Sequence, residues 1–233
     1  MRPIHIISAV LALFLSAPAF GQSFDDYESR QDRFTLNAPG QPEIREITWP
    51  SEYGMEFPGR VYTFRRGTEL YTVTVIDYND AERRYAALER PPSFTQAIYW
   101  QIDITASIQY AATKLYRQRP GATVTYDAYH YIDLVSGQQL NLTNKDGSRT
   151  FASIYLHENR LYILDGTVPA TAPEPGLFTQ SMSFLDAVGN RVRYQQIYHN
   201  RLPPVTMGGR GGRGGGGGRG QGPQGQPTQQ PGQ

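Results

Sequence analysis

Alternating apolar and polar positions dominate the middle of the chain and predict a protein rich in short strands. Residues 59–66 and 70–78 alternate Val, Thr, Tyr and Phe with polar residues on either side of Gly67, so this stretch predicts a β-hairpin. A shorter alternating run at 34–36, which ends at a turn signal, predicts an earlier strand, and residues 44–49 predict another.

Later in the chain, further strand-like runs follow one another at short spacing and predict an antiparallel meander. The predicted strands are 122–134, 139–143, 148–156 and 160–165, and the turn signals are 136–137, 144–147 and 157–159. Residues 191–199 are predicted as a last edge strand. The polar, charged residues 22–32 are interpreted as a lead-in to the domain.

Helical periodicity replaces the alternation in three places, at 79–89, 93–118 and 177–187. The middle segment has the strongest pattern, and Ser93 with Gln96 forms a capping box at its start. Strands and helices are thus segregated along the chain. This order predicts an α+β fold with a mostly antiparallel sheet flanked by helices.

The beginning of the chain has the pattern of a secretory signal, which we assign to residues 1–21. Arg2 precedes an apolar run at 6–15 that is too short to span a bilayer, and small residues follow at Ala19 and Gly21. Cleavage after Ala19 is the alternative to cleavage after Gly21. We therefore expect an exported protein without a transmembrane segment, located in the periplasm or, alternatively, outside the cell.

The end of the chain is rich in Gly, Arg, Gln and Pro, and residues 201–233 are predicted to form a disordered tail. This leaves 22–200 as a single domain. The tail cations Arg210, Arg213 and Arg219 predict weak, salt-sensitive contact with anionic envelope surfaces. Nucleic acid is not expected as a partner, because the tail has no interleaved aromatic residues for base stacking and the domain has a small excess of acidic residues.

Three short motifs resemble those of the PsbP-like family, which includes uncharacterised bacterial exported proteins. Residues 34–42 resemble its opening strand and turn, 160–164 followed by Pro169 resemble its late core strand, and 178–184 resemble its closing helix. The resemblance implies an α-β-α sandwich over residues 30–187. It implies no ligand site, because no site residue of the family is matched in this chain.

Candidate catalytic and metal-binding residues are sparse, so we expect no enzyme activity, cofactor or metal. The chain has no cysteine and no G-x-S-x-G motif. No histidine pair has the spacing of a zinc site. His130 lies on a predicted strand, on the face of Tyr126, Ile132 and Leu134, where we favour a packed, hydrogen-bonded histidine. The alternative is an envelope hydrolase with a site assembled around His130.

One cluster is a candidate binding site. Asp127, Tyr129, Tyr131 and Asp133 are expected to alternate onto one strand face, opposite the presumed core. Exposed tyrosine and aspartate side chains can stack on, and hydrogen-bond, a sugar or another small polar ligand. The alternative is a Tyr-rich face that is covered by a helix or paired across strands.

These patterns together favour an exported, non-enzymatic binding or accessory protein of the periplasm or cell envelope. Its partner is expected to be a small polar ligand or another protein. Besides the hydrolase, a second alternative is a structural subunit of an envelope complex that docks through its tail.

Overall fold

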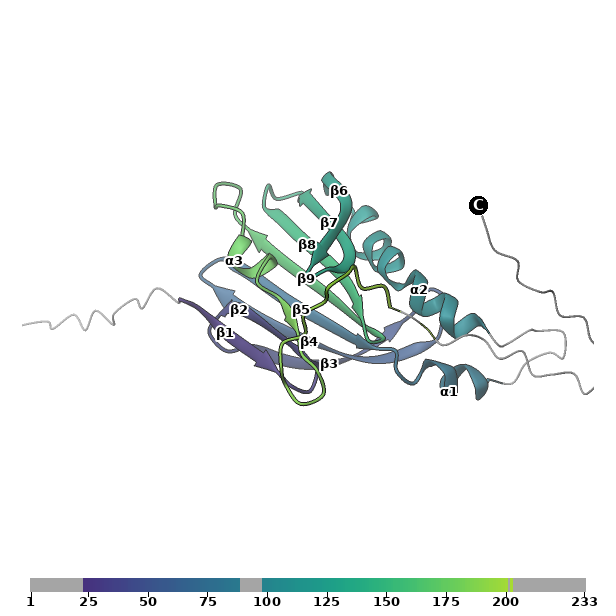
Figure 1. The fold of residues 1–233 in the computed structure, drawn as a ribbon. Coiled ribbons are helices and arrows are strands. Elements are labelled where there is room, and N and C mark those ends of the chain that lie inside the picture. Colours follow the sequence, from purple (N-terminus) through teal and green to yellow (C-terminus); the bar gives the residue numbers. More distant parts are fainter. Residues whose placement is uncertain (1–22, 89–97, 201, 203–233) are drawn as a thin grey trace, which may run out of the picture. The chain divides into compact units, whose positions relative to one another are not determined.

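The computed structural model describes residues 23–88, 98–200 and 202, which all belong to one compact unit of the chain. Strands account for 48% of the structure and helices for 18%. The strands form two antiparallel sheets (Figure 1). The larger has seven strands in the order β3-β4-β5-β9-β8-β7-β6, and the smaller has three in the order β1-β2-β10.

The chain forms these elements in the following order. The strands of the large sheet are β3 (Glu43–Pro50), β4 (Glu56–Arg66), β5 (Glu69–Asp77), β6 (Thr123–Ile132), β7 (Val135–Thr143), β8 (Arg149–His157) and β9 (Arg160–Val168). Those of the small sheet are β1 (Phe24–Ser29), β2 (Phe34–Pro39) and β10 (Ser183–Phe184). The helices are α1 (Ala81–Ala86), α2 (Tyr99–Ala112), a π-helical extension η2 (Thr113–Arg117) and α3 (Gly176–Thr179).

The two faces of the large sheet are covered by different layers. On one face, α1, α2 and η2 close a core that contains Trp49, Ile104, Leu140 and Ile154. On the other face, the small sheet and α3 close a second core, which is dominated by aromatic side chains. Because both faces of the large sheet are covered, its central strands are expected to carry apolar residues on both faces. β8 is accordingly buried along almost its whole length.

This layering shows that the predicted α+β fold with an α-β-α sandwich is wrong. The chain is mostly β-stranded, and the second face of the large sheet is covered by the small sheet with only the short helix α3. Where the resemblance implied a closing helix, α3 ends at Thr179 and β10 follows. Ser183 and Phe184 instead pair with β2. The helix-like spacing of apolar residues over 177–187 is satisfied by burial of Phe178 and Phe184 between the sheets, so tertiary contacts override the local periodicity.

Other local predictions have mixed outcomes. The hairpin at 59–66 and 70–78 is confirmed as β4 and β5, and β6 to β9 form the predicted meander. The predicted lead-in contains β1, because Phe24 and Tyr27 pack inward between outward-facing acidic residues. The predicted edge strand at 191–199 is wrong, since only isolated bridges form there.

The predicted turn at 136–137 is also wrong. The chain turns at Asp133 and Leu134, whose φ angles are 47° and 62°. Gly137 lies within β7 instead, where a Cβ atom would come 2.2 Å from the carbonyl oxygen of Ile154 and 2.4 Å from the ring of Tyr155. This glycine therefore permits close packing of neighbouring strands rather than a turn.

Two of the predicted helices are present in part. The segment 93–118 contains α2 and η2, while its capping box at Ser93 and Gln96 lies outside the described residues. In the segment 79–89, the described residues contain α1, which begins at Ala81 rather than at residue 79. Within the described ranges, no helix is both long and apolar enough to cross a membrane.

Candidate functional site

Three of the four predicted binding residues share one face of β6. Asp127 is placed on the α2 side of the sheet by an ion pair with Arg117 of η2, whose Nε lies 2.7 Å from a carboxylate oxygen. Gln138 of β7 also donates a hydrogen bond to this carboxylate. By strand alternation Tyr129 and Tyr131 lie on the same face, where their exposed fractions are 79% and 49%.

The fourth predicted residue, Asp133, does not share this face. It begins the two-residue turn between β6 and β7, and its carboxylate is ion-paired with Arg193. The sequence-based prediction continued the strand alternation through Leu134, two residues beyond the end of β6.

Asp127 accepts hydrogen bonds from both Arg117 and Gln138, whereas the carboxylate of Asp133 is ion-paired with Arg193 alone among the described residues. Hydrogen bonding from Arg117 is the main effect that lowers the pKa of Asp127, and the hydrogen bond from Gln138 adds to it. The carboxylate is thus held ionised by groups of the protein itself. The two tyrosines, in contrast, are exposed, Tyr129 more than Tyr131.

The backbone of β6 is as informative as its side chains, because β6 is an edge strand of the large sheet. Ile132 and Val135 flank the two-residue turn, and such a closing pair exchanges hydrogen bonds. The pairing is in continuous register from Tyr126 to Ile132. Hydrogen bonding to β7 therefore alternates along this stretch, and every second residue directs its N–H and C=O away from β7.

The outward-facing residues are Asp127, Tyr129 and Tyr131. Ser136, which is paired with Tyr131, gives independent support for this assignment. Its N–H donates to the carbonyl oxygen of Tyr198 at 3.5 Å, on the side of β7 away from β6. We call the outward-facing backbone of these three β6 residues, with the side chains of Tyr129 and Tyr131, the tyrosine edge.

His130 lies on the opposite face of β6. Its Nδ1 is hydrogen-bonded to the hydroxyl of Tyr155 at 2.7 Å, and burial lowers the pKa of His130. Among the described residues, no carboxylate is hydrogen-bonded to or ion-paired with this imidazole. The arrangement holds a neutral, packed histidine without an acidic partner to orient it as a general base.

A second polar cluster, at the ends of β8 and β9, was missed by the sequence analysis. His157 had been placed in a turn, but it is the last residue of β8 and is fully buried. Its Nε2 is hydrogen-bonded to the hydroxyl of Tyr194 at 2.6 Å, and its ring stacks on Phe184 at a centroid distance of 4.4 Å. Burial lowers the pKa of His157 to about 4.

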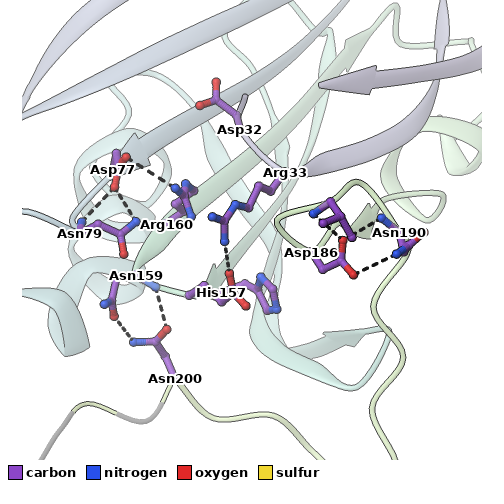
Figure 2. A network of polar contacts seen from close by, with 12 residues as sticks. Asp32, Arg33, Asp77, Asn79, His157, Asn159, Arg160, Asp186, Asn190 and Asn200 are labelled. Atoms are coloured by element: carbon purple, nitrogen blue, oxygen red, sulfur yellow. Dashed lines mark hydrogen bonds and ion pairs between the residues drawn. The ribbon is translucent and has the colours of Figure 1, made fainter. Parts of the chain in front are cut away.

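The turn after His157 is fixed by neighbouring segments (Figure 2). Glu158 and Asn159 both have positive φ angles, 46° and 56°. The Arg33 guanidinium lies 2.6 Å from the Glu158 carboxylate. Asn159 and Asn200 exchange hydrogen bonds, from the Asn159 backbone N–H at 2.9 Å and from the Asn200 side-chain amide at 2.7 Å.

Residues 194–200 therefore form a strap over the end of the sheet. The strap also reaches the neighbouring hairpin, where the N–H of Tyr198 donates to the carbonyl oxygen of Leu134 at 2.8 Å. Because His157 is covered by this strap, we assign it a role in fixing the strap rather than in reacting with a ligand. No local sequence signal links these residues, since the contacts span long stretches of chain.

Two clefts among the described residues are lined by residues outside β6. One, of about 640 Å³, is lined by residues that include Arg119, Asn144, Lys145 and Thr167. Arg119 is already engaged there, since it donates to Asn144 and to Thr150 and is ion-paired with Asp165. Another, of about 620 Å³, lies between α2 and Leu202. The tyrosine edge lines neither of these two clefts.

Metal ligation has no evident place in the part of the chain that the structure describes, since no three His, Cys, Asp or Glu side chains gather there as ligands. Comparisons with protein-family models and with characterised proteins found no match. The resemblance to the PsbP-like family accordingly stays a prediction.

Proposed function

We propose that the protein is an exported, non-enzymatic binding or accessory protein of the periplasm or cell envelope, and that it binds its partner through the tyrosine edge. The observation that carries this proposal is the exposure of Tyr129, at 79%, beside backbone groups that face away from the sheet. Exposed aromatic surface next to unpaired strand groups is typical of an interaction site.

Export is supported by the signal-like pattern of residues 1–21. The absence of cysteine also means that the fold needs no disulfide, and the two cores supply its stability instead. The tail arginines Arg210, Arg213 and Arg219 would add weak contact with anionic envelope surfaces. That contact should weaken as the salt concentration rises.

A polypeptide suits this surface better than a small polar ligand. An edge strand with free N–H and C=O groups can accept another strand, with main-chain hydrogen bonds giving affinity and side chains giving specificity. A small ligand would need a concave site, whereas the clefts described above are lined by other residues. Asp127 is also already held by Arg117.

The proposal is tested by partner capture from envelope extracts with the immobilised mature protein. We expect wild type to retain a partner and the double variant Tyr129→Ala/Tyr131→Ala to lose it, with affinity reduced roughly tenfold or more. Val188→Ala is the matched control, because Val188 is 74% exposed and lies in a turn outside β6. Equal capture by all three proteins would exclude the tyrosine edge as the binding surface.

A thermal-shift screen with sugars and peptidoglycan fragments addresses the small-ligand alternative. A ligand at about a hundred times its dissociation constant stabilises the native state by roughly 2.7 kcal/mol. A hit that disappears in the double variant would replace the polypeptide partner by a small ligand at the same residues.

A further inference from the structure

We infer that the tyrosine edge binds a second copy of this chain, with the two β6 strands antiparallel and Tyr129 opposite Tyr129 of the other copy. This inference rests on the proposed binding surface and names its partner. The contact would join two large sheets into one continuous sheet across a twofold axis.

The register follows from which backbone groups of β6 face away from β7 without a hydrogen-bond partner among the described residues. Antiparallel pairing requires outward-facing residues to meet outward-facing residues. With Tyr129 on the twofold axis, Asp127 meets Tyr131 of the other copy, so Asp127, Tyr129 and Tyr131 are all paired. A shift of the axis to Ala128 or His130 leaves part of this set unpaired. A further shift puts Asp127 opposite itself, which is unfavourable for like charges.

The side chains are also self-complementary in this register. On the α2 side, Tyr129 meets Tyr129, and Tyr131 lies beside Asp127 of the other copy, where its hydroxyl can donate to a carboxylate. On the opposite side, the small Ala128 faces the larger His130. Aromatic pairs and aromatic–polar pairs of this kind stabilise antiparallel strands, and no like charges are opposed.

The two edge strands of the large sheet differ in how well they are protected against pairing with a strand of another molecule. The outer strand β3 carries the charged residues Glu43, Arg45 and Glu46 and ends at Pro50, which are features that discourage strand pairing. β6 has no Lys, Arg or Pro. Its irregularity between Val124 and Tyr126 limits pairing only at the start of the strand. The less protected edge, from Tyr126 onward, is therefore the one with the exposed tyrosines.

A contact through one strand edge is small compared with the ~1,200–2,000 Å² of standard stable interfaces. We therefore expect a reversible dimer that depends on protein concentration. Sedimentation velocity on the full mature chain should show a monomer–dimer equilibrium within concentrations of about 1–500 μM, in the affinity range of small interfaces.

The register can be tested with charged substitutions, because residue 129 of one copy lies opposite residue 129 of the other. Tyr129→Lys and Tyr129→Glu should each weaken dimerisation roughly tenfold or more, since each puts like charges opposite one another. An equimolar mixture of the two variants should associate again, as heterodimers. Circular dichroism checks that each variant is folded, and Val188→Lys controls for a charge at another exposed position.

Disulfide trapping gives a second, independent measurement. The natural chain has no cysteine, so a single introduced thiol can form only an intermolecular disulfide. Tyr129→Cys should give covalent dimers under mild oxidation, because directly opposed strand residues lie within disulfide distance. Tyr131→Cys, opposite Asp127 rather than itself, should crosslink far more slowly, at the rate of Val188→Cys.

The outcomes separate this inference from the proposed function. A dimer that the charge variants leave intact, or a mixture that does not associate, overturns the Tyr129 register. A monomer at every concentration, together with Tyr129-dependent capture of a different protein, overturns self-pairing but supports the proposed binding surface. A monomer without any captured partner contradicts both.

Discussion

Tyr194 donates or accepts a hydrogen bond at 2.6 Å with Nε2 of His157, although the two residues are 37 positions apart in the sequence. This contact joins the strap to the end of β8. It also holds an ionisable group in a site from which water is excluded, since His157 has no exposed surface. The pH dependence of stability should therefore report directly on how the strap is fixed.

We predict that stability falls between pH 6.5 and pH 4 because of His157. Burial lowers its pKa in the folded state to about 4, from an ordinary value of 6.5. Between pH 6.5 and pH 4, His157 is therefore protonated in the unfolded chain but not in the folded chain. The stability that the neutral His157 contributes is complete above pH 6.5 and is lost as the pH falls toward 4. The loss in free energy of unfolding should be ~3 kcal/mol, measurable by urea denaturation at several pH values.

The control for this prediction is His157→Gln, which removes the titrating group and keeps polar atoms near Tyr194. The variant should be less stable at pH 7 but should lose the part of the pH dependence that His157 supplies. If wild type and variant show the same slope between pH 6.5 and pH 5, His157 is not the titrating group.

Tyr198→Phe tests a second contact of the strap. The Tyr198 hydroxyl accepts a hydrogen bond from the backbone N–H of Glu158 at 3.1 Å, in a turn whose residues have positive φ angles. Removing the hydroxyl should lower the free energy of unfolding by about 1 kcal/mol, the usual value for such a bond. Tyr129→Phe, at an exposed position, should change the stability of the monomer very little.

The strands were predictable from the sequence where local signals were sufficient. In β4 and β5, alternation reports the period of a strand, and Gly67, with a φ angle of 58°, supplies the turn. The same reasoning failed for the β6–β7 turn. There, Leu134 adopts a positive φ angle that is rare for its type, while Gly137, which looked like a turn residue, serves close packing between strands.

The candidate site, like the strands, was predictable from the sequence only in part. Alternation alone indicated that Tyr129 and Tyr131 share an exposed face. The outward-facing backbone could not be predicted, because it depends on strand order and on the position of the turn. The contact between His157 and Tyr194 had no sequence signal at all, since it joins a strand end to a segment without regular structure.

Gly137→Ala should be strongly destabilising. An added Cβ atom would come within 2.2 Å of the Ile154 carbonyl oxygen, and backbone atoms in the middle of a sheet cannot move away cheaply. We expect a loss of about 2–4 kcal/mol or failure to fold. Gly176→Ala is the matched control, because its nearest neighbour, the Gln180 side chain, lies at 4.0 Å. A stable Gly137→Ala protein would contradict the described register of β7 and β8.

Arg60 is ion-paired with two carboxylates, one buried and one exposed, so the two ion pairs can be compared at the same guanidinium. Asp32 is buried, lies 2.5 Å from the guanidinium and also accepts a hydrogen bond from the Tyr62 hydroxyl at 2.5 Å. Glu46 lies 3.9 Å from the same guanidinium, and its side chain is 85% exposed. Asp32→Ala should therefore cost about 2–4 kcal/mol, because it leaves buried polar groups without a partner.

Glu46→Gln should change the free energy of unfolding by less than about 0.5 kcal/mol, since an exposed ion pair at this distance is screened by water and salt. Thermal and urea denaturation of both variants, at low and high salt, measures the difference. Asp32 joins the turn between β1 and β2 to the large sheet, so its loss should also loosen the small sheet, visible as faster amide exchange in β1 and β2. Equal effects of the two substitutions would show that burial does not decide the strength of these ion pairs.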